Sequence, residues 1–457
     1  MLASLPSRLR LRLRPLPLRS ALGCRSVAFP AIRQDGDGDG GREGPSFMRP
    51  ESRPAPEEVG GLGSLFSPTP EHSALRDLMR TYVAAEVEPQ ASHHDRVEEF
   101  NLPLFRRLGS ELGVLGLTAP PEHGGAGLDA AACAIVHEEL AYSDPALCLS
   151  YLAHSVLFVH NLSQNGTEEQ RGRLLPAACA GTAVGGMAMS EPGAGTDVLG
   201  MRTGAVRDEA AGGWILDGAK MWITNGTLTG EGTGDLFLVY ARTGPGRTDL
   251  TQFVVEGGME GFGLGQKVRD KMGMRASMTA ELVFDGVLVP DANVVGEVDG
   301  AVLCMMRNLE IERVALAAMA LGIARRCIDD MKRYAGQRTA FGRDLYGFGQ
   351  VQRHVAESYA EYMAGRCYVY GLCGGLDLAT HGNGLDADGV KLYCAPMAKA
   401  VADRAIQVMG GYGYVGEYTV ERMFRDARLL EIGGGTNESH HKNMARDLRR
   451  TGDEPLP

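Results

Sequence analysis

The chain has 457 residues, of which 44% are hydrophobic, so it can bury a large core and is expected to hold more than one subdomain. Its formal net charge of -11 argues against a nucleic-acid partner, because phosphate binding requires a basic surface. No stretch reaches the roughly 18–20 uninterrupted apolar residues of a membrane-spanning helix, so no membrane span is expected.

The amino terminus has the composition of a targeting segment. Residues 1–34 contain seven arginines and no lysine or acidic residue, with Leu, Ser and Pro between them. This pattern is typical of a mitochondrial transit peptide and predicts a place in the mitochondrial matrix, although a disordered basic tail would look similar. Residues 35–70 are rich in Gly, Pro and Glu and are expected to form a disordered linker.

Three blocks follow, and their residue patterns differ. Residues 71–182 have apolar residues at helical spacing, which predicts an N-terminal helical domain. Residues 183–298 contain short β-branched and aromatic runs between Gly, Asp and Pro, which predicts a β domain. Residues 299–450 return to helical periodicity. The predicted fold class is therefore α+β and multi-domain, in the order helices, strands, helices.

The cysteines and the glycine-rich segments set limits on the chemistry. The nine cysteines form no C-x-x-C pair, so we expect buried free thiols in a reducing compartment. Gly410 to Gly416 follows a helical segment rather than a strand, so Gly410-Gly411 is interpreted as a helix C-cap and not as a Rossmann dinucleotide loop.

The second glycine-rich segment, Ala188 to Gly200, opens the β block. Ser190, Thr196 and the nearby glycines offer hydroxyls and backbone amides to an anionic ligand, but a polar loop without a ligand fits equally well. Trp222 and Thr224 are expected near a strand end, where an aromatic plane can lie against a flat heterocycle.

Glu312 is the main candidate for catalysis. Helical spacing places it on the same face as Met305, Leu309 and Leu316, whereas Glu310 is expected to face solvent. A carboxylate in an apolar stripe is costly unless it is paired, and desolvation raises its pKa towards a value that suits a base. From periodicity alone, a buried ion pair with an arginine remains an alternative.

Two long motifs make the sequence similar to a known family. They are Ala188 to Gly200 (AMSEPGAGTDVLG) and Gln407 to Asp426 (QVMGGYGYVGEYTVERMFRD). Both occur in the acyl-CoA dehydrogenase family, in this order, and the chain resembles that family from about residue 71 to 448. The resemblance implies an N-terminal helical domain, a middle β-barrel-like domain and a C-terminal four-helix bundle. It also implies FAD as the cofactor.

The resemblance assigns the flavin contacts. Met187 to Thr196 is similar to the segment that holds the flavin, and Trp222 to Thr224 to the segment against its ring. Arg338 and Phe341 match an R-x-x-F-G motif that reaches the FAD of a neighbouring subunit, which implies a homotetramer. The implied cofactor-binding residues are Met187, Ala188, Met189, Ser190, Gly195, Thr196, Trp222, Ile223, Thr224, Arg338, Phe341, Gln407, Gly410, Gly411, Thr436, Asn437 and Glu438.

The resemblance also indicates where the base lies. Many members carry it in a Y-E-G-T-like loop, where this chain has Gly434. Leu309 to Arg313 (LEIER) instead resembles the L-D-L-E-R of isovaleryl-CoA dehydrogenases, whose base lies on this helix, so Glu312 is the implied catalytic residue. The absent side chain at Gly434 is expected to leave room for a β-branch of the substrate. Substrate contacts are implied for Thr196, Leu303, Glu310, Arg313, Gly434 and Gly435.

The implied reaction is α,β-dehydrogenation of a short branched acyl-CoA, isovaleryl-CoA in leucine breakdown, with electrons passed to electron-transfer flavoprotein. Glu312 is expected to remove the α-proton while the amide of Gly434 donates a hydrogen bond to the thioester carbonyl oxygen. The alternatives are a dehydrogenase for longer or other branched chains, an oxidase that reacts with oxygen, and a non-catalytic mitochondrial assembly flavoprotein. Oxidases of this kind usually have longer chains.

Four positions depart from the family pattern. Gly349 stands where a flavin-binding glutamine is common, with Gln350 and Gln352 beside it. His440 and His441 replace arginines, and adjacent helical residues point to different faces, so no metal site is expected there. Leu303 stands where isovaleryl-CoA dehydrogenases often have a tyrosine, which weakens the substrate assignment but not the reaction class.

Overall fold

The computed structural model describes residues 63–380 and 382–450, so the predicted transit peptide lies outside the described residues. The first helices form one block, as the periodicity predicts. They are α2 (Gly63–Phe66), α3 (Pro70–Tyr82), α4 (Glu88–Val97), α5 (Leu102–Ser110), α6 (Ala130–Ser143), α7 (Pro145–His154), α8 (Asn161–Asn165) and α9 (Glu168–Ala180). Capping residues fix several of their starts. In α9, for example, Thr167 and Gln170 form a reciprocal capping box.

The end of the predicted linker is ordered in the structure. Residues 63–66 form α2, and Phe66 is buried. The guanidinium of Arg76 holds this segment, since its Nη2 donates to the carbonyl oxygen of Phe66 at 2.8 Å. The linker prediction for residues 35–70 is therefore wrong at its C-terminal end, because the buried Phe66 and the hydrogen bond from Arg76 dock this segment on the core.

The middle block is a sheet with mostly antiparallel pairing. Its strands are β1 (Gly185–Ala188), β2 (Gly204–Asp208), β3 (Gly213–Thr224), β4 (Leu236–Arg242), β5 (Leu250–Glu256), β6 (Phe262–Lys267), β7 (Thr279–Pro290) and β8 (Val294–Val295). The order is β6-β7-β3-β2-β4-β5-β8, and β1 pairs with β4 in parallel. One apolar cluster fills the sheet, and a second joins α8 and α9 to strands β4 and β5.

The last block is helical again. It contains α10 (Ala301–Gln337), the short strands β9 (Thr339–Ala340) and β10 (Arg343–Asp344), α11 (Gly349–Cys373), α12 (Gly384–Met409), α13 (Thr419–Leu430) and α14 (Asn437–Arg450). Helix α10 packs against α11, α12 and α13, and also against α6 of the first block. A single large core therefore joins both helical blocks.

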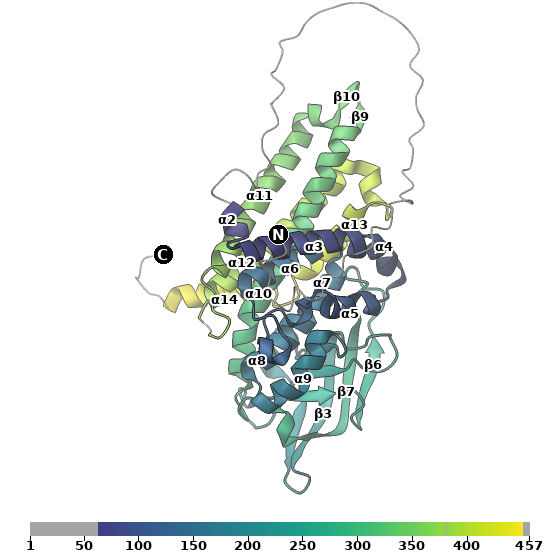
Figure 1. Cartoon of the computed structure of the whole chain (residues 1–457). Helices are drawn as coiled ribbons and strands as arrows, with labels where there is room; N and C mark the ends of the chain where they lie inside the picture. Colours follow the sequence, from purple (N-terminus) through teal and green to yellow (C-terminus); the bar gives the residue numbers. More distant parts are fainter. Residues whose placement is uncertain (1–62, 381, 451–457) are drawn as a thin grey trace, which may run out of the picture.

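Helix α10 sets the shape of the molecule. In Figure 1, the ends of α10 and α11 project at the top of the view with β9 and β10 at the tip, and the sheet with β3, β6 and β7 lies at the opposite end. Because one continuous helix runs from the sheet to this projection, groups near its two ends cannot meet within the same chain.

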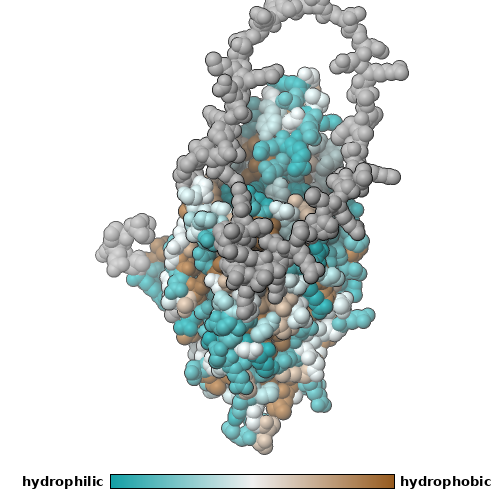
Figure 2. Space-filling view, viewed as in Figure 1, coloured by the Kyte–Doolittle hydropathy of each residue, from teal (hydrophilic) through white to brown (hydrophobic). Residues whose placement is uncertain are grey.

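One described segment, Pro145–Asn165, has the length and apolar composition of a membrane-spanning helix. It covers α7, a π-helical turn and α8, and 89% of the apolar window is buried inside the protein. Its apolar residues therefore serve the core. On the face seen in Figure 2, hydrophobic residues are interspersed among hydrophilic ones.

Candidate active site

Glu312 lies in the first third of α10 and is 6% exposed, which confirms its predicted burial. Its Oε2 is buried and accepts no hydrogen bond from the described residues. The neighbouring Arg313 does not pair with it, because Nη1 of Arg313 contacts Oδ1 of Asp388 at 3.2 Å. Burial raises the pKa of Glu312 to about 7, against the opposing charges of Arg313 and Lys391. This carboxyl group is suited to accept a proton near neutral pH.

Gly434 lies beside Glu312 in the turn between α13 and α14. A Cβ added at Gly434 would lie 3.4 Å from Oε1 of Glu312 and 2.2 Å from Cδ1 of Leu316. Leu316 therefore occupies the space that the Cβ of any side chain at position 434 would need. The expectation that this glycine leaves free room for a substrate branch is wrong on that side of the turn, because the neighbouring leucine has taken the volume.

Glu310 is buried, at 8% exposed, and the prediction that it faces solvent is wrong. Its carboxylate accepts hydrogen bonds from the backbone amides of Gly382 at 3.0 Å and Asn383 at 3.1 Å, just before α12. The physical reason is the position of α10, which is enclosed by helices on several sides, so residues on opposite faces of it are both buried. Glu310 and Arg313 thus have partners within the protein.

The predicted flavin loop, Met187 to Thr196, continues from β1 and packs on the start of α10. Met187 and Met189 belong to an apolar cluster with Ala301, Met305 and their neighbours. The hydroxyls of Ser190 and Thr196 make no hydrogen bond within the described part of the chain, and a Cβ at Gly195 would meet open space. The loop therefore offers free donors and an accessible backbone, close to the N-terminal end of the helix that carries Glu312.

A buried ion pair supports this loop from beneath. Nζ of Lys220, which is fully buried, donates to the carbonyl oxygen of Met189 at 3.0 Å and to Oε1 of Glu191 at 2.9 Å. The carboxylate of Glu191 also accepts from the amides of Arg202 and Thr203. Burial lowers the pKa of Lys220 to about 8, against the charge of Glu191. The pair fixes the backbone of the loop.

The strand segment Trp222 to Thr224 lies next to the same loop, since the amide of Met221 donates to the carbonyl oxygen of Ser190 at 2.8 Å. The pairing of β3 with β7 shifts register between Lys220 and Ile223. Trp222 has φ +67° and is 59% exposed, although its neighbour Ile223 is buried. The irregularity turns the indole out of the sheet, as expected of bulges beside functional sites.

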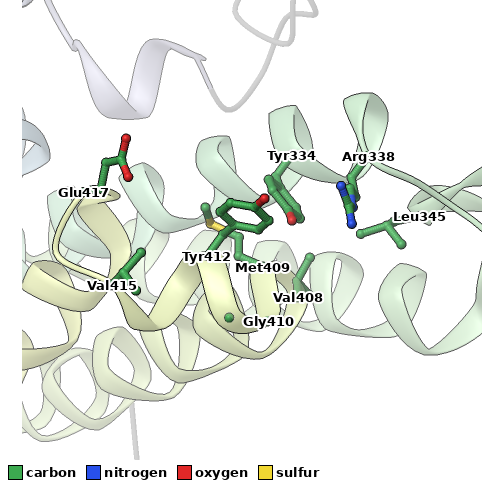
Figure 3. Close-up of a pocket in the computed structure, with 10 residues that line it drawn as sticks. Tyr334, Arg338, Leu345, Val408, Met409, Gly410, Tyr412, Val415 and Glu417 are labelled. Carbon is green, nitrogen blue, oxygen red and sulfur yellow. The ribbon is translucent and has the colours of Figure 1, made fainter. Parts of the chain in front are cut away.

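The other predicted flavin residues lie elsewhere. Arg338, Gly410 and Gly411 line a cleft of about 540 Å³ at the ends of α10 and α12. In Figure 3, the rings of Tyr334 and Tyr412 lie close together between Arg338 and the loop that carries Glu417. Phe341 is 95% exposed nearby in sequence, and Gln407 is exposed one turn before Gly410. The prediction that Gly410 caps a helix is confirmed, since α12 ends there with φ +60°.

The structure thus divides the predicted cofactor residues into two groups. The first contains the loop from Met187, the segment from Trp222 and the turn around Gly434, all near Glu312. The second surrounds the cleft at Arg338. Glu312 and Gln337 are 25 residues apart on one helix, which corresponds to about 38 Å at 1.5 Å per residue. This distance is longer than an extended FAD molecule, so one cofactor cannot touch both groups of the same chain.

The side chains present fit a flavin dinucleotide. The hydroxyl of Thr224 joins those of Ser190 and Thr196 in having no partner in the described chain, and Oδ1 of Asn437 is buried without a donor. At the cleft, Arg338 forms no ion pair with any described residue, although its guanidinium lies 5.9 Å from the ring centroid of Tyr412. Of the two candidate glutamines, Gln352 donates to the carbonyl oxygen of Tyr346 at 2.7 Å, which leaves Gln350 exposed and available.

Sequence reasoning missed the charged groups behind Glu312. Lys391 and Asp388, on α12, and His440, on α14, are all buried. Lys391 stands in the largely apolar segment GVKLYCA, where a lysine at a core position was a usable signal. His440 was noticed only as a departure from a family pattern. The buried His440 and the exposed His441 do point to different faces of α14.

Comparison with known families assigns all three blocks of the chain. The family models described as acyl-CoA dehydrogenase N-terminal, middle and C-terminal domains match residues 69–182, 186–287 and 300–449. A mitochondrial isovaleryl-CoA dehydrogenase from Solanum tuberosum is 40% identical over 82% of this chain and 89% of its own length. A mitochondrial 2-methylacyl-CoA dehydrogenase from the same plant is 36% identical over 82% of this chain and 89% of its length.

Solved structures agree with this assignment. Butyryl-CoA dehydrogenase from Megasphaera elsdenii matches with a TM-score of 0.78 and 32% identity, over 83% of this chain and 98% of its own. A chain from a structure described as the electron transferring flavoprotein of Acidaminococcus fermentans matches with a TM-score of 0.78 and 31% identity, over 84% of this chain and 98% of its own. A prolyl acyl carrier protein oxidase matches with a TM-score of 0.78 and 28% identity, over 83% of this chain and 99% of its own.

These matches cover the helical, sheet and helical blocks of the chain in one order. The chain belongs to the acyl-CoA dehydrogenase family of FAD-dependent oxidoreductases.

Proposed function

We propose that this enzyme dehydrogenates a short branched-chain acyl-CoA, isovaleryl-CoA to 3-methylcrotonyl-CoA, with Glu312 as the catalytic base. The observation that carries the proposal is the buried carboxylate of Glu312, which has no hydrogen-bond partner on Oε2 and whose pKa burial raises to about 7. The similarity to isovaleryl-CoA dehydrogenases at about 40% identity supports the substrate class.

The residues of the site then have distinct tasks. Glu312 accepts the α-proton of the thioester on its unpaired oxygen. The amide of Gly434, which lies beside Glu312, has no backbone acceptor in the described chain, and its task in the proposal is to donate to the carbonyl oxygen on which charge develops. The FAD that the family binds supplies the acceptor for the hydride from the β-carbon. Trp222 and the loop from Met187 exclude water around the flavin ring.

Substrate contacts are proposed for Thr196, Leu303 and Gly434. Leu303 is 45% exposed at the start of α10 and offers an apolar surface to the acyl group. Glu310 and Arg313 act through the protein, because their charged groups are taken by the amides before α12 and by Asp388. Thr436 and Asn437, which follow the turn, remain candidates for flavin contacts, as do Glu438 and Gln350.

The assembly and cellular setting are also proposals. Two separated groups of flavin-contacting residues are explained if the cleft at Arg338 serves the FAD of a second copy, and a homotetramer would provide this. The arginine-rich first 34 residues and the mitochondrial relatives support a location in the mitochondrial matrix. Electron-transfer flavoprotein is the proposed electron acceptor.

The test is turnover of the purified FAD-loaded enzyme with isovaleryl-, butyryl- and palmitoyl-CoA and an artificial electron acceptor. We expect the highest kcat/KM with isovaleryl-CoA, and a loss of about a thousandfold or more in Glu312→Gln, since the general base is removed. Glu297→Gln changes an exposed carboxylate just before α10 and should have no effect. A palmitoyl-CoA optimum would rule out the branched-chain assignment, and an active Glu312→Gln enzyme would rule out the base.

An oxidase is a second candidate, because an oxidase of similar length and fold is among the matching structures. Chain length alone therefore does not separate the two reactions. Turnover under air without an added acceptor distinguishes them. We expect slow turnover under this condition and a large increase when electron-transfer flavoprotein is added.

A further inference from the structure

The glycine turn beside Glu312 is anchored at both ends. At its start, the amides of Ile432 and Gly433 donate to the carbonyl oxygen of Leu429 at 2.9 and 2.8 Å. Beyond the turn, the amide of Asn437 donates to the carbonyl oxygen of Glu431 at 3.2 Å. Between them, Gly434 and Gly435 have φ +64° and +95°, a conformation that glycine adopts readily and other residues do not. The turn needs further support, because two successive glycines are the most flexible residues available.

Two buried side chains supply that support at the carbonyl oxygen of Gly435. Nζ of Lys391 donates to this oxygen at 2.5 Å, and Nε2 of His440 lies 3.1 Å from it. The histidine ring also packs on the backbone, since a Cβ at Gly435 would lie 3.1 Å from Cε1 and 3.2 Å from Nε2. Lys391 therefore fixes the direction of this carbonyl, and the ring of His440 limits the movement of the backbone beside it.

His440 is itself held in place. It is fully buried, and its Nδ1 forms a short hydrogen bond with Oδ1 of Asp388, which is 2% exposed. The same carboxylate oxygen contacts Nη1 of Arg313 at 3.2 Å. Because Arg313 follows Glu312 on α10, these contacts close a ring of residues from the base through α12 and α14 back to the turn.

The ring nitrogens of His440 both face acceptors, a carboxylate and a carbonyl oxygen. An imidazole donates to both only when it is doubly protonated. The charged groups around it are Asp388 and Lys391 from α12 and Arg313 from α10. Burial lowers the pKa of His440, Lys391 and Arg313 lower it further, and Asp388 opposes them. In the neutral ring the proton stays on Nδ1, where the carboxylate accepts it, and the ring then holds Gly435 by packing on its backbone rather than by donating from Nε2.

We propose that His440, held by Asp388, is a positioning residue that fixes the carbonyl of Gly435 together with Lys391 and thereby holds the amide of Gly434 beside Glu312. This inference rests on the proposed function, because it assumes that the amide of Gly434 donates to a thioester carbonyl. It assigns a purpose to two buried groups that the reaction itself does not use.

The test compares two ligands that cannot react. One is a CoA thioester with sulfur in place of its β-carbon, and the other is the corresponding CoA thioether without a carbonyl. Dissociation constants are measured by calorimetry with FAD-loaded wild type, His440→Gln, Asp388→Asn and the double variant. The matched control is His441→Gln, which changes the exposed neighbour.

We expect His440→Gln to weaken the thioester about tenfold, or 1.4 kcal/mol, and the thioether less than twofold. Asp388→Asn should have the same effect, and the double variant should be no worse than either, because the two residues act as one unit. In steady state, kcat should fall about tenfold with KM for the acyl-CoA changed less, and His441→Gln should match wild type.

Equal weakening of both ligands, or loss of FAD in both single variants, would overturn the positioning role and leave a structural one. Failure of the proposed function has a different signature. In that case wild-type enzyme would not prefer the thioester over the thioether, whatever residue stands at position 440.

Discussion

At the scale of single residues, the protonation of Glu312 controls the proposed reaction. Burial raises its pKa to about 7, and a base works only when deprotonated, so activity should fall as the pH drops below that value. We expect kcat/KM to rise with pH through an apparent pKa near 7 and then to level off. The pH profile of kcat/KM tests this. The same profile measured with an α-deuterated substrate is the control, because it shows whether proton transfer limits the rate. An acid limb at the ordinary glutamate pKa of about 4.3 would contradict it.

Arg313 and Lys391 both oppose the burial that raises the pKa of Glu312. The ammonium charge of Lys391 lowers the pKa of Glu312, opposing the effect of burial. Lys391→Met should therefore raise the pKa of Glu312 and move the acid limb of kcat/KM to higher pH, while Lys442→Met, an exposed change on α14, should leave it in place. If the acid limb of kcat/KM moved to lower pH in Lys391→Met, the charge of Lys391 would not be lowering the pKa of Glu312.

Gly434 and Leu316 form a steric pair that can be tested by stability. Gly434→Ala should lower the unfolding midpoint of the FAD-loaded enzyme, because its Cβ would lie 2.2 Å from Cδ1 of Leu316 and φ is +64°. Overpacking of this kind costs about 1–3 kcal/mol. With Leu316→Ala in the background, the added cost of Gly434→Ala should shrink to that of the backbone strain. If the losses of stability from Gly434→Ala and Leu316→Ala simply add in the double variant, the overlap between the new Cβ and Leu316 does not cause the loss.

Residue-level prediction from sequence succeeded where one periodicity decided the outcome. The burial of Glu312 follows from its spacing with Met305 and Leu309 on one helical face. The same reasoning failed for Glu310, because α10 is enclosed at that point and two backbone amides before α12 donate to the carboxylate. The ring through Asp388 and His440 joins residues far apart in sequence, and no local pattern signals such contacts.

At the scale of elements, the loop from Met187 depends on the ion pair beneath it. Lys220→Met would leave Glu191 buried without its cation, a change that costs about 3–5 kcal/mol. We expect weaker FAD binding and a lower unfolding midpoint, both measured by flavin release on heating. Adding Glu191→Gln removes the stranded charge and should restore part of the loss. A Lys220→Met enzyme that keeps wild-type FAD affinity would show that the loop is held by its apolar contacts alone.

The order of helices, strands and helices was predictable because hydrophobic periodicity differs between the blocks. The turn of Trp222 out of β3 was not, since it depends on a register shift against β7, which lies more than 50 residues away in the sequence. Its expected position near a strand end was still found, because aromatic and β-branched residues mark the strand. Residues 63–66 were missed as a helix, because a single docked phenylalanine is too short a signal.

At the scale of the whole molecule, the separation of the two flavin groups predicts that active sites form between copies. Co-expression of Glu312→Gln with Arg338→Ala, each inactive alone, should restore activity. One site of the mixed assembly combines an intact base with an intact cleft. Each variant carries a different affinity tag, mixed assemblies are purified through both tags, and their activity is measured. Glu312→Gln co-expressed with itself under both tags is the control. Mixtures as inactive as the single variants would place both groups on the same FAD.

No pattern in the sequence indicates that Glu312 and the cleft at Arg338 are kept apart by the length of α10. The resemblance implied a cofactor shared between subunits, and in the structure a continuous helix separates the two groups. Physical reasoning from the sequence alone reached the element order and the burial of Glu312, whereas its role as the base and the residues of the second group were identified only through the family.

The most direct test of the central claim is anaerobic mixing of the FAD-loaded enzyme with isovaleryl-CoA while the visible absorbance of oxidised flavin is followed. The account predicts rapid bleaching in wild type and almost none in Glu312→Gln, which should still bind the ligand and remain yellow. Bleaching at the wild-type rate in Glu312→Gln would show that another group removes the α-proton.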